Sequence, residues 1–173
     1  KDDKDLYNQS AKCVLRVEKP ELKITEIIVD DASKAVSDNP EEGQIKINYT
    51  KDIKTVFDLR RLVAQENGFN RGEVDLVSLF IPYSTKEGTD FALLNDNEQI
   101  IEIISENPTR HFTYRIINEV KSFNQKMLKR YLKVAKENGL EMTGDEIKNI
   151  YKRTGGNLDS ILATIYYIAS KKE

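Results

Sequence analysis

Histidine and cysteine, the residue types most often used for metal binding and nucleophilic catalysis, each occur once in this chain, as His111 and Cys13. A zinc centre needs several such ligands, and a Cys–His nucleophile pair needs both side chains to meet in the fold. Cys13 belongs to the apolar alternation Cys13-Leu15-Val17, which is typical of a buried strand residue. His111 opens an expected strand, where a strand-edge histidine is the simpler interpretation. We therefore expect no catalytic residue and no metal site.

Motifs that bind phosphate groups do not occur in the sequence. It contains no Gly-rich loop of the Walker type and no Gly-x-Gly-x-x-Gly motif, and no serine lies in a nucleophile elbow. The acidic pairs Asp30-Asp31 and Glu41-Glu42 lack the glycine-punctuated spacing of a calcium loop. The sequence therefore predicts a non-enzymatic protein with no cofactor.

A regular series of basic residues marks the last third of the chain. Steps of three and four residues place them on one face of an expected helix, opposite Met127, Tyr131 and Ala135. The basic residues of this face are Lys126, Lys129, Arg130, Lys133 and Lys136. Such a face meets an acidic protein surface or phosphates, or it is simply solvated. Among partners we favour a protein over nucleic acid, because the chain is slightly acidic and the series lacks interleaved exposed aromatic residues.

The sign of the charge changes along the chain. The net charge is −2, with 39% apolar and 32% charged residues. Residues 121–173 hold 11 Lys and Arg against 6 Asp and Glu, whereas residues 1–120 hold 16 against 23. We expect a flexible segment over 1–10, a sheet domain over 11–118 and a basic helical bundle over 120–173. No run approaches the ~20 consecutive apolar residues of a membrane span.

Apolar periodicity predicts the individual elements. Strands are expected over 12–17, 22–30, 44–49, 73–83, 91–94 and 111–120, with the fourth interrupted by Pro82. A helix is expected from Thr55 to Asn67, ending at Gly68. A shorter helix with Asp96 as its N-cap carries Ile100 and Ile104.

This order of elements resembles the ubiquitin-like β-grasp fold and, within it, the Ras-association and FERM-type variants. The resemblance covers about 75 residues, from Gln44 to Val120. It is carried by two runs, Lys54-Thr55-Val56-x-x-Leu59-x-x-Leu62-Val63 and Leu93-Leu94-Asn95-Asp96-Asn97-Glu98-x-Ile100. A Ras-association relationship implies that Lys54, Arg60 and Arg61 face the acidic edge of a small GTPase; the alternative is that these three are ordinary solvent-facing charges.

The C-terminal unit resembles the helical lid of clamp-loader and other AAA+ proteins and, less closely, a ubiquitin-associated domain. One helix runs to Asn138-Gly139, a second starts near Gly144, and a third follows Thr154-Gly155-Gly156-Asn157. The double glycine is expected to form a turn that requires positive φ. Asp159 stands where active lids carry an arginine that senses the nucleotide, and a carboxylate there would repel phosphate.

Together these features predict an α+β protein, a β-grasp mixed sheet followed by a three-helix bundle, that acts as a non-enzymatic interaction module, an adaptor or scaffold in a larger intracellular protein. The expected partner has an acidic surface, such as a small GTPase, ubiquitin or a complex subunit. Two alternatives remain: a degenerate AAA+ relative acting in DNA replication or chromatin silencing, and a ubiquitin-pathway adaptor. A single cysteine and the absence of a signal segment suit the cytoplasm or the nucleus.

Overall fold

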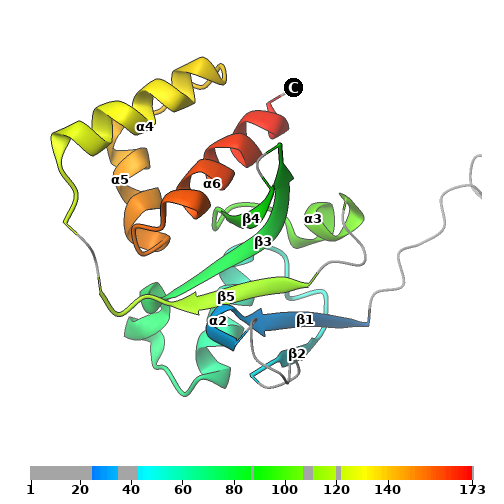
Figure 1. The fold of residues 1–173 in the computed structure, drawn as a ribbon. Helices are drawn as coiled ribbons and strands as arrows, with labels where there is room; N and C mark the ends of the chain where they lie inside the picture. Colours follow the sequence, from blue (N-terminus) through cyan, green and yellow to red (C-terminus); the bar gives the residue numbers. More distant parts are fainter. Residues whose placement is uncertain (1–24, 35–42, 87, 107–110, 120–121, 173) are drawn as a thin grey trace, which may run out of the picture.

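A computed structural model describes residues 25–34, 43–86, 88–106, 111–119 and 122–172. These residues form an α+β fold in which helices pack around a five-stranded mixed sheet (Figure 1). The α+β class expected from the sequence is confirmed. The expected segment 1–10 and the strand 12–17, with Cys13, lie outside the described residues.

The sheet places the first and last described strands side by side. The strands are β1 (Glu26–Asp31), β2 (Ile45–Asn48), β3 (Val77–Thr85), β4 (Gly88–Leu93) and β5 (Phe112–Ile116). Their order across the sheet is β2-β1-β5-β3-β4. At the centre β1 and β5 run parallel, with Val29 opposite Phe112, while the other neighbours are antiparallel.

Hydrogen bonds close to each helix start explain where the helices begin. The helical elements are η1 (Ala32–Lys34), α2 (Val56–Glu66), η2 (Arg71–Leu76), α3 (Ile100–Glu106), α4 (Gln125–Glu137), α5 (Gly144–Arg153) and α6 (Leu158–Lys171). Before α2, Asp58 N donates to Thr55 Oγ1 at 3.3 Å, and Thr55 N donates to the Asp58 carboxylate at 3.0 Å. The backbone bond from Thr55 lowers the pKa of Asp58. This reciprocal capping box stabilises the helix start.

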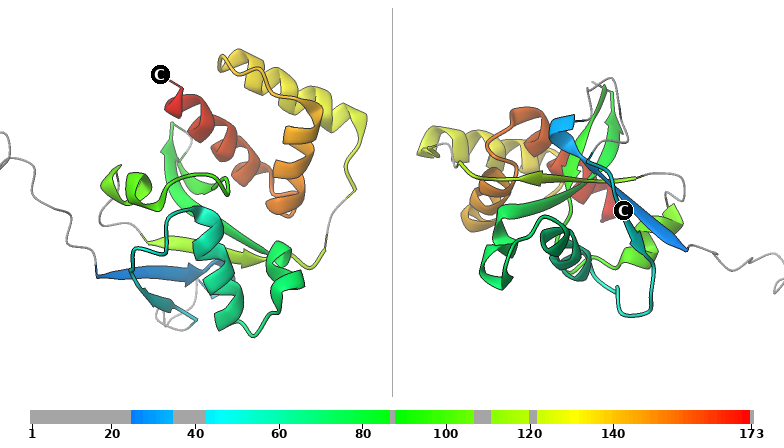
Figure 2. Two further views of the ribbon diagram at one scale, coloured as in Figure 1. Left: turned by 180° about the vertical axis from the view of Figure 1, so that it is seen from behind. Right: turned by 90° about the horizontal axis from the view of Figure 1, so that it is seen from below.

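Strand β3 is buried on both faces of the sheet. Val77 and Leu79 belong to the same core cluster as Leu59 and Val63 of α2. Phe80 points to the opposite face and packs with residues of α4, α5 and α6. The sheet therefore lies between α2 and the C-terminal helices, an arrangement that can be followed in Figure 2.

Glycines form the turns of the C-terminal helices. Gly139 follows α4 with a φ of +79°, and Gly155 and Gly156 follow α5 with φ of +70° and +77°. Residues other than glycine rarely adopt this conformation. Asn157 then begins α6, its side chain accepting from Ser160 N at 3.0 Å. The expected turn at the double glycine is confirmed.

Helix α6 packs beside β4, the outermost strand on its side of the sheet (Figure 1). Leu94 N donates to Leu79 O at 3.0 Å, so the neighbouring Leu93 turns its N–H away from β3. Thr164 Oγ1 accepts from that Leu93 N at 2.9 Å. The helix thus covers a strand edge that would otherwise be open to pairing.

A domain boundary between 118 and 120 stays a prediction, which limited proteolysis would test.

Three local expectations were wrong, at residues 73–76, at Pro82 and at Asp96. Residues 73–76 belong to η2 and not to the strand expected over 73–83. Pro82 lies within β3, opposite Phe91. The Pro82 nitrogen points to the side of β3 on which β5 lies. Because β5 pairs with β3 only from Val77 to Phe80, the missing N–H of Pro82 removes no hydrogen bond between strands. Asp96 does not cap α3, which starts at Ile100; its carboxylate accepts instead from Arg60 of α2, at 2.9 Å.

Candidate functional site

The expected basic face of α4 includes four residues predicted to contact a partner, Lys126, Lys129, Arg130 and Lys133, and all four are exposed. Lys136, the fifth residue of the expected face, is exposed as well. On the opposite side of the helix Tyr131 and Ala135 are buried against α5 and α6. Burial raises the pKa of Tyr131, so it stays a neutral core residue. Among the described residues, none of the four cations forms an ion pair. We call this group the α4 basic face.

The three basic residues expected on α2 do not share one surface. Lys54 and Arg61 are exposed, but the Arg60 side chain is only 3% exposed. Arg60 follows Val56 by four residues and precedes Val63 by three, which places it on the packed side of the helix. The expectation that Arg60 faces solvent or a partner is therefore wrong, and the helical spacing contained that signal.

Arg60 instead belongs to a charged network that joins α2, η2, the β4–α3 loop and α5. Its Nη1 donates to Asp96 Oδ1 at 2.9 Å and its Nη2 to Asp75 Oδ1 at 3.2 Å. Arg153 Nη2 lies 3.6 Å from the same Asp75 oxygen. Burial and the nearby Arg153 charge lower the pKa of Arg60, while Asp96 and Asp75 act in the opposite direction. The Asp75 carboxylate thus lies against both guanidinium groups, whereas Asp96 binds only that of Arg60.

Two nitrogens of this network, Arg60 Nε and Arg153 Nη1, are buried and have no hydrogen-bond partner among the described residues. Buried donors are normally paired, so each such atom is a site where a further acceptor would be stabilised. The Arg153 side chain is 22% exposed and reaches the surface, whereas Arg60 does not. The Arg153 side chain is therefore the more accessible of the two, although its Nη1 is itself buried.

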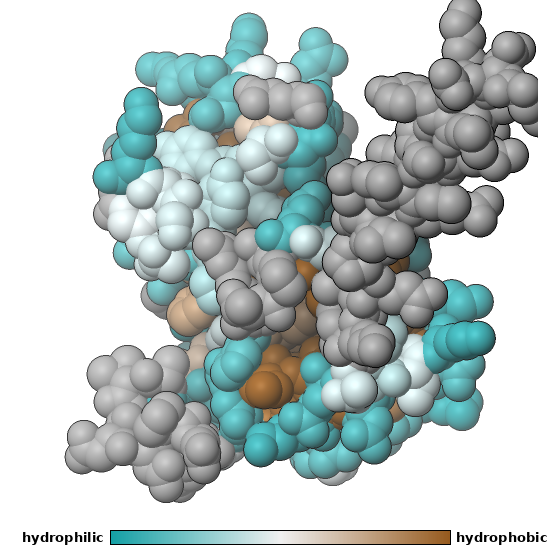
Figure 3. Space-filling view, turned by 90° about the vertical axis from the view of Figure 1, so that its right-hand side faces the viewer, coloured by the Kyte–Doolittle hydropathy of each residue, from teal (hydrophilic) through white to brown (hydrophobic). Residues whose placement is uncertain are grey.

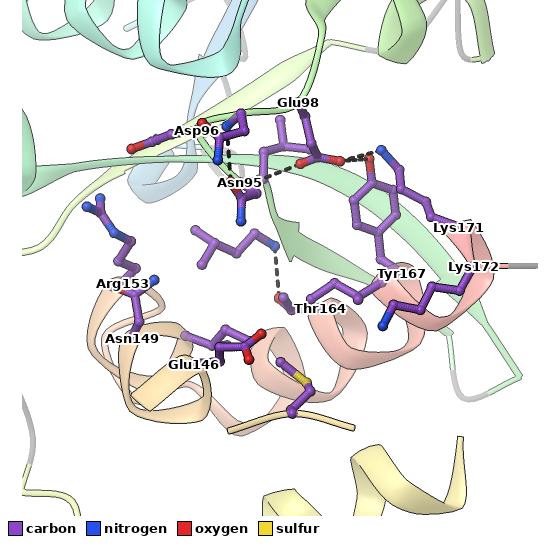
Figure 4. Close-up of a pocket in the computed structure, with 16 residues that line it drawn as sticks. Asn95, Asp96, Glu98, Glu146, Asn149, Arg153, Thr164, Tyr167, Lys171 and Lys172 are labelled. Atoms are coloured by element: carbon purple, nitrogen blue, oxygen red, sulfur yellow. Dashed lines mark hydrogen bonds and ion pairs between the residues drawn. The ribbon is translucent and has the colours of Figure 1, made fainter. Parts of the chain in front are cut away.

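Arg153 stands at one end of a cleft between the loop 95–99, α5 and α6 (Figure 4). The cleft has a volume of about 690 Å³, within the range of about 300–1,000 Å³ that ligand pockets occupy. Met142, Ile150 and Ile168 contribute apolar surface to it. No residue of this cleft was selected from the sequence as a binding residue, because its three walls come from separate segments of the chain.

The other end of the cleft is formed by a cluster around Glu98. Its carboxylate accepts from Asn95 N at 2.6 Å, from Tyr167 OH at 2.9 Å and from Lys171 Nζ. Burial and the Glu98 charge raise the pKa of Tyr167, so the phenol donates as a neutral group. This cluster ties α6 to the β4–α3 loop and leaves the Glu98 carboxylate fully occupied.

The remaining residues selected from the sequence lie elsewhere. His111 Nδ1 lies 2.9 Å from Asp30 Oδ2 at the exposed end of β5. Asp159 is exposed in the first turn of α6. The pKa of Asp90 is raised mainly by the burial of Asp90 itself and, to a smaller extent, by the negative charge of Asp159. Within the described ranges, no group of three or more His, Cys, Asp or Glu is placed to hold a metal ion.

Comparison with models of known protein families and with curated proteins finds no match for this chain. Among the helices that the structure describes, none is long and apolar enough to cross a membrane. In Figure 3, hydrophilic residues lie around the edge of the visible face, and a smaller hydrophobic area is exposed in its lower half. The large apolar side chains exposed among the described residues are Phe57, Ile101 and Leu158.

Proposed function

We propose that this chain is a non-enzymatic protein-interaction module, in which a ubiquitin-like β-grasp sheet carries a three-helix bundle and the α4 basic face binds an acidic surface of a partner protein. The order β2-β1-β5-β3-β4, with a parallel central pair and α2 between β2 and β3 in the chain, supports the β-grasp assignment. Fold alone implies no activity, so the functional part of the proposal depends on the surface of α4.

The carrying observation is the contrast between the two sides of α4. Its apolar side is packed, whereas four cations on the other side are exposed and form no ion pair within the described residues. Charges on one helix face act together on a single acidic surface and speed the encounter with it.

The proposal is tested by reversing Lys129 and Arg130 to Glu and measuring binding to a partner isolated with the full chain. Each exposed ion pair is worth about 0.2–1 kcal/mol, so reversing two charges is expected to weaken binding ~10-fold or more. The control Lys148→Glu/Lys152→Glu changes the net charge equally on exposed residues of α5 and should retain binding. Added salt should weaken the wild-type complex, because the Debye length shortens from ~10 Å at 0.1 M to ~3 Å at 1 M.

Equal loss of binding in both variants, or an unchanged affinity with a flat salt response, would contradict a role for the α4 basic face. Binding that falls only when Lys54 and Arg61 are reversed would move the contact to α2 and favour a small-GTPase partner. The alternatives, a ubiquitin-pathway adaptor and an AAA+ relative acting on DNA, are tested with ubiquitin and duplex DNA as ligands of the same variants.

A further inference from the structure

We propose that the cleft between the loop 95–99, α5 and α6 binds an extended peptide of a partner protein that carries a large apolar residue close to an acidic one. The site goes beyond the α4 basic face and uses none of its residues. Figure 4 shows side chains from all three segments around one space, with Arg153 at one end and Lys171 and Lys172 at the other.

The apolar part of the cleft explains the large apolar residue. Met142 and Ile168 are partly buried and pack against the core cluster of the bundle, and Ile150 is a buried member of that cluster. All three line the cleft. A methionine adapts its shape to different ligands, and burying one large apolar side chain is worth about 1.5–3 kcal/mol. The cleft therefore favours an aliphatic or aromatic anchor.

Carboxamide side chains on two walls of the cleft are the reason why we expect the ligand to bind with an extended main chain. Asn149 lies on the α5 side, and Asn95 and Asn97 lie on the loop side. Asn95 Oδ1 accepts from Asn97 N at 3.0 Å, but within the described residues the side chains of Asn97 and Asn149 have no partner. Each carboxamide offers a donor and an acceptor, which match the N–H and C=O of an extended peptide.

The balance of charge in the cleft is the reason why we expect an acidic residue in the peptide ligand. Its three carboxylates are already engaged: Asp96 binds Arg60, Glu98 binds Lys171, and Glu146 accepts from the backbone and hydroxyl of Thr143. The cations are less well satisfied. Arg153 has a buried nitrogen without a partner, and Lys172 forms no ion pair with a described residue.

A carboxylate of the ligand would complete the Arg153 site. In the described part of the chain, the only acid within ion-pair distance of this guanidinium is Asp75, which is 81% exposed and 3.6 Å away. Such an exposed pair is weak, whereas a charge-assisted hydrogen bond within the cleft is stronger. Nucleic acid fits less well, because three carboxylates line the cleft and its aromatic residue, Tyr167, is buried.

The test begins with a displayed library of random nonapeptides selected on the full chain. We expect enrichment of sequences with Asp or Glu near a large apolar residue. One enriched peptide is then synthesised with a fluorescent label, and its affinity is measured by anisotropy. Asn149→Trp, which fills the cleft from an exposed position, and Arg153→Gln, which removes the cation, should each weaken binding at least 10-fold.

Two controls separate this site from general destabilisation and from the α4 basic face. Lys148→Trp adds the same bulk at the neighbouring exposed position of α5, which does not line the cleft, and should leave the affinity unchanged. Lys129→Glu/Arg130→Glu should also bind the peptide normally. If the α4 basic face proves not to bind a partner, the result of the peptide experiment still stands. If the cleft proves not to bind a peptide, the result of the α4 experiment still stands.

The inference is overturned if no sequence is enriched, if the enriched peptides lack an acidic residue, or if their affinity does not respond to Asn149→Trp in a variant with an unchanged melting temperature. Peptides that require a phosphorylated residue, or duplex DNA that competes with the selected peptide for the cleft, would assign it to a different ligand class and would equally refute the proposal.

Discussion

Replacing Thr164 with valine removes one hydroxyl from a position that is 1% exposed and keeps a β-branched side chain of similar shape. Thr164 Oγ1 donates to Ser160 O and accepts from Leu93 N at 2.9 Å. The Ser160 carbonyl remains within the α6 hydrogen-bond ladder, but Leu93 N loses its acceptor at the covered edge of β4. A buried unpaired donor costs about 1–3 kcal/mol, which lowers the Tm by roughly 2–4 °C per kcal/mol for a chain of this size.

Thr154→Val is the matched control. Thr154 is as deeply buried, and its hydroxyl donates to Ile150 O at 2.7 Å and to Tyr151 O at 3.1 Å. Both carbonyls also accept backbone bonds, from Thr154 N at 3.0 Å and from Gly156 N at 2.9 Å. The substitution therefore leaves no unpaired group, and we expect a smaller loss of stability, below about 1 kcal/mol.

Urea unfolding followed by circular dichroism measures both free energies of unfolding, and amide exchange reports on Leu93 directly. Thr164→Val should lose more stability than Thr154→Val and should accelerate exchange at Leu93. Equal losses in the two variants, or unchanged exchange at Leu93, would refute the conclusion that α6 satisfies the edge of β4.

Three further outcomes are expected. Arg60→Met should change the free energy of unfolding by no more than about 1 kcal/mol, because an apolar side chain of similar length replaces a buried cation whose carboxylate partners reach solvent. Arg60→Glu should lower that free energy by about 3–5 kcal/mol, because it buries a carboxylate beside two others. Urea unfolding measures both changes. Because the pKa of Tyr167 is raised in the folded state, its contribution to stability is fully present below pH ~10 and is lost as the pH rises further; Tyr167→Phe should flatten this alkaline decline, and an equally steep decline would contradict it. Calorimetry with ATP or GTP and magnesium should detect no binding, since the sequence has no phosphate loop; micromolar affinity would refute this.

Elements set by local chemistry were predictable from the sequence. The helix expected over 55–67 matches α2, because Thr55 and Asp58 form its cap and Gly68 follows it with a φ of +76°. The turn at Gly155 and Gly156 follows from the same kind of rule. In each case the residues that decide the conformation lie within a few positions of one another.

Expectations failed where a distant partner competes with the local rule. Asp96 has the chemistry of an N-cap, but Arg60, 36 residues earlier, takes its carboxylate. A proline normally interrupts a strand, but Pro82 does not interrupt β3, because the pairing of β3 with β5 stops at Phe80. A single sequence does not contain these pairings, because they depend on which strands and helices become neighbours.

The sequence by itself determined the α+β class, the places of most helices and turns, and the basic periodicity of α4, since each of these depends on residue type and short spacing. Only the tertiary structure decided that Arg60 binds Asp75 and Asp96, that α6 covers the edge of β4, and that the loop 95–99, α5 and α6 enclose a cleft. The physical reason is that these pairings and the shape of the cleft arise from packing between segments that lie up to 73 residues apart, and such packing leaves no periodic signal in any one segment.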